Sequence, residues 1–201
     1  KVGPIIGLGP MDAREGLFLK KNFGVIPQGW WYEANQKYSR ELLKKYKLDG
    51  PEVNPAPTPG DNRVKEFRDA EDLLDEEEHS EYRSDGGTIL YQALDRLDCK
   101  YSAKEIVRDC STPTKGSQAC VKRHVRYLAG KPRYVNFYPW QKKTENIRTS
   151  TDANNANCKK ARKSTHCVVV RRGLHVRSDV VQGQALIALA SGESKFYGVV
   201  R

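Results

Sequence analysis

Basic side chains gather in the second half of the chain, and their densest run lies near residue 160. Residues 99–201 contain 21 Lys and Arg against 6 Asp and Glu, a net charge of +15, whereas residues 1–98 contain 14 and 19, a net charge of −5. A half-chain this basic is expected to attract a polyanion, and nucleic acid is the usual one. The side chains that we expect to contact phosphate are Lys159, Lys160, Arg162 and Lys163. The alternative is that this run is a solvated loop.

The cysteines offer a second chemistry. They number five, Cys99, Cys110, Cys120, Cys158 and Cys167, in a chain of 201 residues that is too long to need disulfide bonds for stability. We therefore expect reduced thiols. A zinc site formed by Cys158, His166 and Cys167 is an alternative, although the sequence has no C-x-x-C pair to anchor one.

The composition sets limits on the fold and the location. Hydrophobic residues make up 38% and charged residues 30% of the chain, and the mean hydropathy is −0.72, so we expect a modest core and some disordered segments. Apolar runs all fall short of the ~20 residues that cross a bilayer. We expect an intracellular protein, in cytoplasm or nucleus, without a membrane partner. Because the chain opens at Lys1 rather than Met, we also expect a fragment or an incomplete gene model.

The first elements that could position these residues are a hairpin and a helix. Leu17–Leu19 and Gly29–Tyr32 are expected as strand pieces around a turn at Pro27-Gln28-Gly29. From Gln36 the apolar period becomes helical, because Tyr38, Leu42 and Tyr46 recur every four residues until Gly50-Pro51. Gly7-Leu8-Gly9 is too short for a phosphate-binding loop and predicts a turn.

A proline-rich connector and an acidic segment follow. Residues 51–60 include four prolines and predict a semi-rigid connector, and residues 66–81 include nine acids that predict a solvated loop or helix face without chemistry. Such stretches carry few buried contacts. We therefore expect proteolysis at 51–60 and near 141–146.

Three helices and an aromatic strand are expected next. Their apolar faces consist of Ile89, Leu90, Ala93, Leu94 and Leu97; of Ala103, Ile106, Val107 and Cys110; and of Cys120, Val121, His124, Val125 and Leu128. On such a face His124 is predicted to be a core histidine rather than a ligand. Tyr134–Trp140 is aromatic and predicts a strand that packs against these helices.

The remaining chain predicts three strands and a helix. The strands are expected at 145–152, 165–172 and 174–181, with a tight turn at Arg171-Arg172-Gly173, and the helix from Ser191 to Val200. Three antiparallel strands followed by a helix are expected to begin an α+β domain, and we expect the remainder of that domain to be absent from this sequence.

The order of short motifs resembles the Pol polyprotein of copia-type retrotransposons. In the first half these motifs are Asn54–Gly60 (family NPVATPG), Tyr82–Tyr91 (YRSLVGSLLYL), Leu94–Asp98 with Lys104–Arg108 (QDRPDIQ and VKELSR), and Pro113-Thr114 with Arg126–Gly130 (KPT and RYLKGT). In the second half they are Thr151–Asn154 (TDSDWAG), Ala161–Thr165 (TRKSTSGG) and Ala188–Glu193 (ALSSGEAEYYA). Seven pieces in the family's order, at near-family spacing, carry the resemblance.

The resemblance implies the C-terminal end of a reverse transcriptase followed by the N-terminal half of an RNase H. Enzymes of this kind copy RNA into DNA and degrade the RNA of the hybrid, using Mg²⁺ ions held by carboxylates. The implied segments are 1–50 (hairpin and helix of the reverse-transcriptase end), 51–81 (connector and acidic segment), 82–140 (helical thumb or connection-like region) and 141–201 (RNase H-like half). The implied partners are an RNA–DNA hybrid or other nucleic acid and the remainder of the polyprotein.

The departures from the family pattern predict an inactive chain. The resemblance places Asp152 on the first metal-ligand position of the RNase H, as a weak remnant, but puts Lys195 where the family has a glutamate. Glu193 remains two residues earlier, about 200° around a helix axis. An ammonium group there repels a metal ion, and the sequence contains no Tyr-x-Asp-Asp polymerase motif.

Three functional hypotheses follow, and the first two expect nucleic-acid binding without catalysis. The first is a degenerate Pol fragment that binds no Mg²⁺ and keeps only affinity for nucleic acid. The second is a non-enzymatic basic binding module, derived from such an element and domesticated. A third possibility is an RNase H that becomes active once the missing half is supplied.

Overall fold

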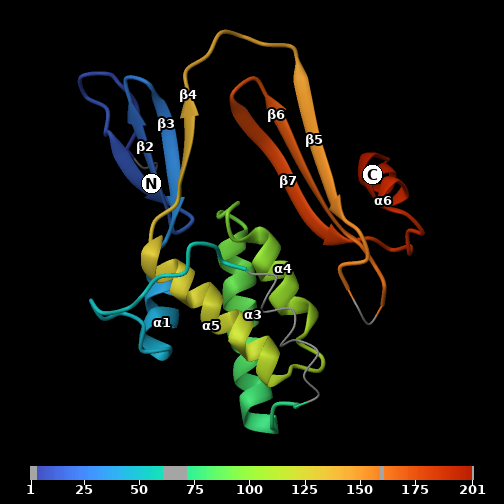
Figure 1. Cartoon of the computed structure of the whole chain (residues 1–201). Helices are drawn as coiled ribbons and strands as arrows, with labels where there is room; N and C mark the ends of the chain where they lie inside the picture. The colour runs from blue at the N-terminus through green and yellow to red at the C-terminus, as the bar shows by residue number, and fades with distance from the viewer. Residues whose placement is uncertain (1–3, 61–71, 159–160, 201) are drawn as a thin grey trace. The chain divides into compact units, whose positions relative to one another are not determined.

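The computed structural model describes residues 4–60, 72–158 and 161–200, which divide into two compact units (Figure 1). The helical unit comprises Lys1–Pro27 and Trp31–Phe137, and the sheet unit comprises Gln28–Trp30 and Tyr138–Arg201. Five helices and two sheets lie in the described ranges, with helices and antiparallel strands in separate stretches of chain. The predicted α+β class is therefore confirmed.

The first strands form hairpins. β1 (Glu15–Phe18), β2 (Lys21–Ile26), β3 (Gly29–Ala34) and β4 (Val135–Pro139) form one sheet in the order β1-β2-β3-β4. The predicted turn near Pro27 is confirmed between β2 and β3. A second hairpin, between β1 and β2, was not predicted. Its two-residue turn consists of Leu19 and Lys20, which both adopt positive φ, 48° and 61°.

Four helices build the hydrophobic core of the helical unit. Apolar spacing predicts most of their buried faces, but the face predicted for Ile89–Leu97 is wrong in part, because that helix ends at Ala93 and Leu90 and Leu94 are exposed. They are α1 (Lys37–Lys45), α3 (Glu76–Ala93), α4 (Lys100–Arg108) and α5 (Lys115–Gly130). The core consists of Leu42, Leu43, Ala56, Leu74, Tyr82, Ile89, Ala93, Cys99, Ala103, Ile106, Val121, Val125, Tyr127 and Leu128.

The acidic run begins α3. Asp75 is the N-cap: its Oδ1 accepts from the Glu78 backbone N–H at 2.8 Å, and the Glu78 carboxylate accepts from the Asp75 N–H at 3.3 Å. Glu76, Glu77 and Glu78 fill the first turn, where negative charge offsets the helix dipole. Residues 66–81 were expected to form either a solvated loop or a helix face. From residue 76 on, the structure shows the helix. Residues 66–71 of the predicted segment lie outside the described residues.

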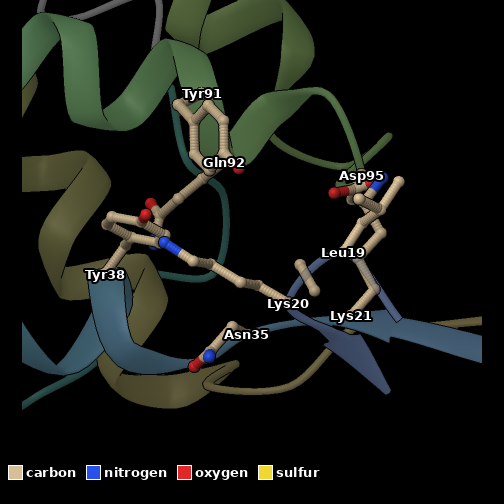
Figure 2. A pocket seen from close by; sticks show the side chains of 9 residues that line it. Leu19, Lys20, Lys21, Asn35, Tyr38, Tyr91, Gln92 and Asp95 are labelled. Atoms are coloured by element: carbon tan, nitrogen blue, oxygen red, sulfur yellow. The ribbon is translucent and has the colours of Figure 1, made fainter. Parts of the chain in front are cut away.

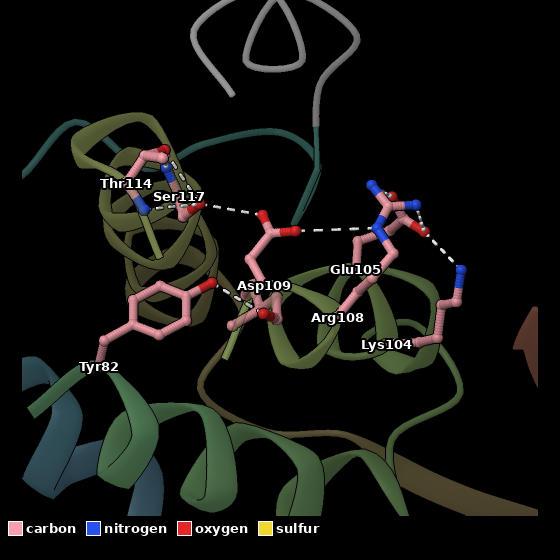
Figure 3. Close-up of polar contacts among 8 residues, drawn as sticks. Tyr82, Lys104, Glu105, Arg108, Asp109, Thr114 and Ser117 are labelled. Atoms are coloured by element: carbon pink, nitrogen blue, oxygen red, sulfur yellow. Dashed lines mark hydrogen bonds and ion pairs between the residues drawn. The ribbon is translucent and has the colours of Figure 1, made fainter. Parts of the chain in front are cut away.

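Polar contacts tie α3, α4 and α5 together (Figure 3). The Tyr82 hydroxyl of α3 donates to the Ile106 carbonyl of α4 at 2.7 Å. Between α4 and α5, the Ser117 hydroxyl donates to Asp109 at 3.0 Å, and Ser117 also completes the cap that Thr114 provides for α5. These bonds satisfy buried polar groups, so the acids and hydroxyls in this cluster serve the fold.

The proline-rich connector docks on α5, which corrects the expectation that it has few contacts. Ala56 is buried, and its N–H donates to the Arg126 carbonyl at 3.3 Å. The Arg126 guanidinium donates to the Asn54 carbonyl at 2.8 Å. A Cβ on Gly130 would come within 2.6 Å of Pro55, so glycine is needed for this close approach. The proline run is thus a packed strap along α5.

The sheet unit contains the three strands and the helix that the sequence predicts. β5 (Ile147–Asn154), β6 (Thr165–Arg172) and β7 (His175–Gly183) form an antiparallel sheet in the order β5-β6-β7, followed by α6 (Ser191–Val199). A tight turn joins β6 and β7, but it consists of Gly173, at φ +60°, and Leu174; the predicted turn residues Arg171 and Arg172 are still paired in β6.

The interior of the sheet unit is polar. Its buried side chains are Ser164, Thr165, His166, Gln184 and Ser194, with Ala188 as the apolar member among the described residues. Large apolar side chains, namely Leu186, Leu189, Phe196, Val199 and Val200, are more than 60% exposed. Since apolar burial contributes most of the stability of a small unit, we infer that this unit is only marginally stable.

Candidate functional site

Asp152, the predicted metal ligand, lies near the end of β5 with an exposed side chain. It is paired with Cys167 of β6, and Ala153 is paired with His166. Paired residues of antiparallel strands share a face, and consecutive residues alternate between faces. Asp152 and Cys167 therefore point to one face of the sheet, and Ala153 and His166 point to the other.

Helix α6 covers the His166 face. Its buried residues are Ser194 and Gly198, one turn apart, and a Cβ on Gly198 would lie 3.5 Å from the Cβ of His166. Lys195 is exposed on this helix. The structure thus does not bring Asp152 and Lys195 together, because the sheet lies between the Asp152 side chain and α6.

Glu193 has a structural role at the start of α6. Its carboxylate accepts from the Leu189 N–H at 2.7 Å and from the Tyr197 hydroxyl at 2.6 Å. The Tyr197 hydrogen bond is the main reason that the pKa of Glu193 lies below its ordinary value. This glutamate caps the helix and is not directed toward Asp152.

Within the described residues, potential metal-binding side chains do not cluster. In the parts of the chain that the structure describes, no group of three or more His, Cys, Asp or Glu is placed to hold a metal ion. The zinc alternative also fails on geometry: His166 and Cys167 are consecutive in β6, so their side chains point to opposite faces. The five cysteines all lie within the described residues, and none of them forms a disulfide bond there.

The predicted basic cluster occupies the loop between β5 and β6. Arg162 and Lys163 are exposed, and Arg162 adopts φ 54°. The loop is closed by Cys158, whose N–H donates to the Lys163 carbonyl at 3.0 Å and whose carbonyl accepts from the Arg162 N–H at 2.6 Å. The other two members, Lys159 and Lys160, lie outside the described residues.

His124 is a core residue, as predicted. Its side chain is fully buried, and Nδ1 lies 2.7 Å from the Ser102 hydroxyl. Burial lowers the pKa of His124 to about 4, with a smaller contribution from the nearby Arg96 charge. The imidazole is therefore neutral at pH 7.

A buried ion pair lies beside His124. Arg96 and Asp98 are joined by two hydrogen bonds, of 2.7 and 3.3 Å, and the Tyr127 hydroxyl donates to the same carboxylate at 2.8 Å. Burial opposes the charge of Asp98, but the bonds from Arg96 and Tyr127 outweigh it and hold the pKa of Asp98 below its usual range. This network stabilises the loop between α3 and α4.

A pocket in the helical unit is lined by residues of the β1–β2 turn, the β3–α1 junction and the end of α3 (Figure 2). Lys21 pairs with Asp95 at 2.5 Å, and Tyr38 packs edge-to-face on Tyr91 with ring centroids 5.2 Å apart. Figure 2 shows Lys20 extending across the pocket toward Tyr38. The ion pair joins the start of β2 to the segment after α3, and the aromatic pair joins α1 to α3.

One basic feature is not predictable from the sequence alone. Arg148 of β5 lies directly opposite Arg171 of β6, and both side chains are exposed. The two residues are 23 positions apart, and only the strand register brings them together. The sequence shows an arginine in each of two predicted strands, but it does not show the register that places these arginines opposite each other.

In the described ranges, no helix is long and apolar enough to cross a bilayer.

Comparison with known proteins gives one informative similarity. The chain is 29% identical over 120 residues to the Retrovirus-related Pol polyprotein from transposon RE1 of Arabidopsis thaliana. The match covers 60% of this chain and 8% of that protein, so the chain spans less than a tenth of the relative's length. No family model matches the sequence, and no solved structure matches the fold. The similarity supports an origin in a retrotransposon Pol polyprotein.

Proposed function

We propose that this chain is a degenerate piece of a copia-type Pol polyprotein, from the end of the reverse transcriptase into the first half of the RNase H. Its remaining property is nucleic-acid binding. The observation that carries the proposal is the similarity to the transposon RE1 polyprotein. The seven ordered motifs, and the β5-β6-β7-α6 order of the sheet unit, are compatible with it.

The binding half of the proposal rests on charge. Residues 99–201 carry a net charge of +15, and cations that neutralise phosphates release counterions, which makes affinity favourable and salt-dependent. Arg162 and Lys163 are exposed in the β5–β6 loop, and Lys159 and Lys160 belong to the same proposed cluster. The proposed partners are an RNA–DNA hybrid, or another nucleic acid, and the rest of the polyprotein, inside the cell.

We further propose that the chain has no metal-dependent catalytic activity. In the parent family, Mg²⁺ would supply an activated water and stabilise the leaving oxygen, and several carboxylates must offset the ion charges. Here Asp152 contributes one carboxylate, on the sheet face away from α6. The residues present do not fit a metal pair.

A domesticated, non-enzymatic binding module is the second candidate. The observation that favours it is the low acid content of the basic half, which contains 6 Asp and Glu. Flanking gene sequence separates the two candidates. An upstream Tyr-x-Asp-Asp motif supports a polyprotein piece, and an independent reading frame without one supports a module.

Fluorescence anisotropy with a labelled RNA–DNA hybrid tests the binding proposal. The full chain is titrated at 50, 100 and 200 mM salt, next to a variant in which Arg162 and Lys163 are changed to Gln. We expect affinity to fall steeply with salt, and the slope of log affinity against log salt to shrink by about 1–2 in the variant. Affinity that does not change with salt would contradict phosphate binding.

A further inference from the structure

Among the described residues, positively charged side chains without a carboxylate partner lie at the end of the three-stranded sheet where the turn joins β6 to β7. Arg148 and Arg171 face each other across the β5–β6 ladder and are exposed. In the described part of the chain, no carboxylate pairs with either guanidinium. Directly opposed residues have Cα atoms about 4.5–5.5 Å apart, so the two side chains share one small area of the sheet face.

This pairing is unfavourable in the free protein. Like charges directly opposite each other in a sheet destabilise it by roughly 0.2–1 kcal/mol. The neighbouring pair on the same face, Ser150 and Val169, is uncharged, and the nearest acid on that face is Asp179, opposite Val169 on the other side. An anion bound between the two arginines would remove the repulsion.

Further cations gather at the same end. Gln141 fastens the segment before β5 to the β6–β7 turn, because its side chain donates to the Arg172 carbonyl at 3.0 Å and accepts from the Leu174 N–H at 2.8 Å. Lys142 and Lys143 follow Gln141 directly, with Glu145 as the acid of that segment.

A β-bulge adds another arginine. Val170 is paired with Ser178 but Arg171 with Val176, which leaves the exposed Arg177 as the extra residue of β7. Bulges re-aim a side chain relative to the regular ladder. Arg148, Arg171 and Arg177 therefore come from three different strands to one end of the sheet.

We propose that Arg148, Arg171 and Arg177, together with Lys142 and Lys143, form a binding surface for the phosphate backbone of a nucleic acid. This inference rests on the proposed function and adds a site to it. The surface is distinct from the Arg162–Lys163 loop, which follows the opposite end of β5. From Arg148 to Asn154 the strand advances by six residue steps, or about 20 Å. Guanidinium groups held on a sheet suit phosphate because each can bind two oxygens at once.

The test uses the full chain with Arg148→Gln, Arg171→Gln and the double substitution. The probe is a labelled 20-base-pair RNA–DNA hybrid, titrated at 50–200 mM salt. Lys44→Gln, an exposed lysine of α1, is the charge-matched control. We expect each arginine variant to bind about 3–10-fold more weakly at low salt, with the salt slope reduced by about 1 per arginine. The control should change neither.

Stability provides an independent readout. Because each substitution removes a repulsion, the arginine variants should melt about 1–4 °C higher than the natural chain while binding more weakly. A variant that binds weakly because it is misfolded would melt lower, so the two measurements separate binding from folding.

The outcomes distinguish this inference from the proposed function. Failure of the natural chain to bind the hybrid would contradict the proposed function and the surface with it. Binding with an unchanged salt slope in the double variant would overturn the surface alone. Competition by polyglutamate as strong as that by unlabelled hybrid would overturn the assignment to nucleic acid in favour of an acidic polypeptide.

Discussion

Asp152 and Lys195 lie on opposite sides of the three-stranded sheet. Asp152 shares a face with Cys167, whereas α6, which carries Lys195, packs against His166 on the other face. The proposed resemblance to copia-type RNase H places Lys195 where that family has a glutamate, so Lys195→Glu is the substitution that would be expected to restore a metal ligand. Because the sheet separates the two positions, we expect that this substitution does not create a metal site with Asp152.

The first prediction is that Lys195→Glu creates no divalent-metal site. A new carboxylate on α6 cannot share an ion with Asp152 while the sheet separates them, and two hard-oxygen ligands would in any case be few for Mg²⁺ or Mn²⁺. Isothermal titration with Mn²⁺ should give the same weak heats for the variant and the natural chain. Tight binding by Lys195→Glu that disappears when Asp152→Asn is added would show that the two residues meet.

The second prediction concerns acid stability and His124. The folded pKa of about 4 lies below the ordinary value of 6.5, so between these values the unfolded chain binds a proton that the folded chain does not. Stability from this group is complete above pH 6.5 and is lost as the pH falls toward 4. The loss amounts to about 3 kcal/mol. Denaturant unfolding at pH 7, 6, 5 and 4 measures it.

His124→Gln isolates this contribution. Arg96 and Asp98 also face His124. The pKa of Asp98 lies below its ordinary value, so the stability that its charge contributes is lost at a lower pH than that of His124. The variant is expected to be less stable at pH 7 and to lose less stability between pH 6.5 and 4 than the natural chain. Equal losses in both proteins would mean that His124 takes up its proton in the folded state.

The third prediction concerns the connector. Ala56→Asp would place a carboxylate against α5 in a buried position. Burying an unpaired polar group is expected to cost about 2–4 kcal/mol and to release the strap. Limited proteolysis with mass spectrometry should find residues 54–58 protected in the natural chain and cut in the variant.

Ala161→Asp, at an exposed position, is the matched control and should leave residues 54–58 protected. Rapid cutting at 54–58 in the natural chain would instead support the sequence-based expectation that the connector is a weak point.

Helical periodicity was the most informative sequence signal. Tyr38 and Leu42 predicted α1, and Ile106 and Val121 predicted the faces of α4 and α5 that fill the core. The turn at Leu19 and Lys20 was missed for a local reason. Two-residue turns with positive φ normally use Asn, Asp or Gly, and neither residue belongs to that set.

Features that depend on distant contacts were not predictable. The strap around Ala56 exists because Arg126 and Gly130 of α5 lie beside it, whereas proline content alone predicted a semi-rigid connector with few buried contacts. Similarly, the Arg148–Arg171 pair follows from the β5–β6 register. A one-residue shift of that register would move every side chain to the other face.

The most direct test of the whole account is an RNA–DNA hybrid assay that follows binding and cleavage in the same samples. The natural chain and Asp152→Asn are incubated with labelled hybrid and Mg²⁺ at low salt, with an active RNase H as positive control. The account predicts that both proteins bind the hybrid equally and that neither cleaves it. Mg²⁺-dependent cleavage by the natural chain that is lost in Asp152→Asn would contradict it.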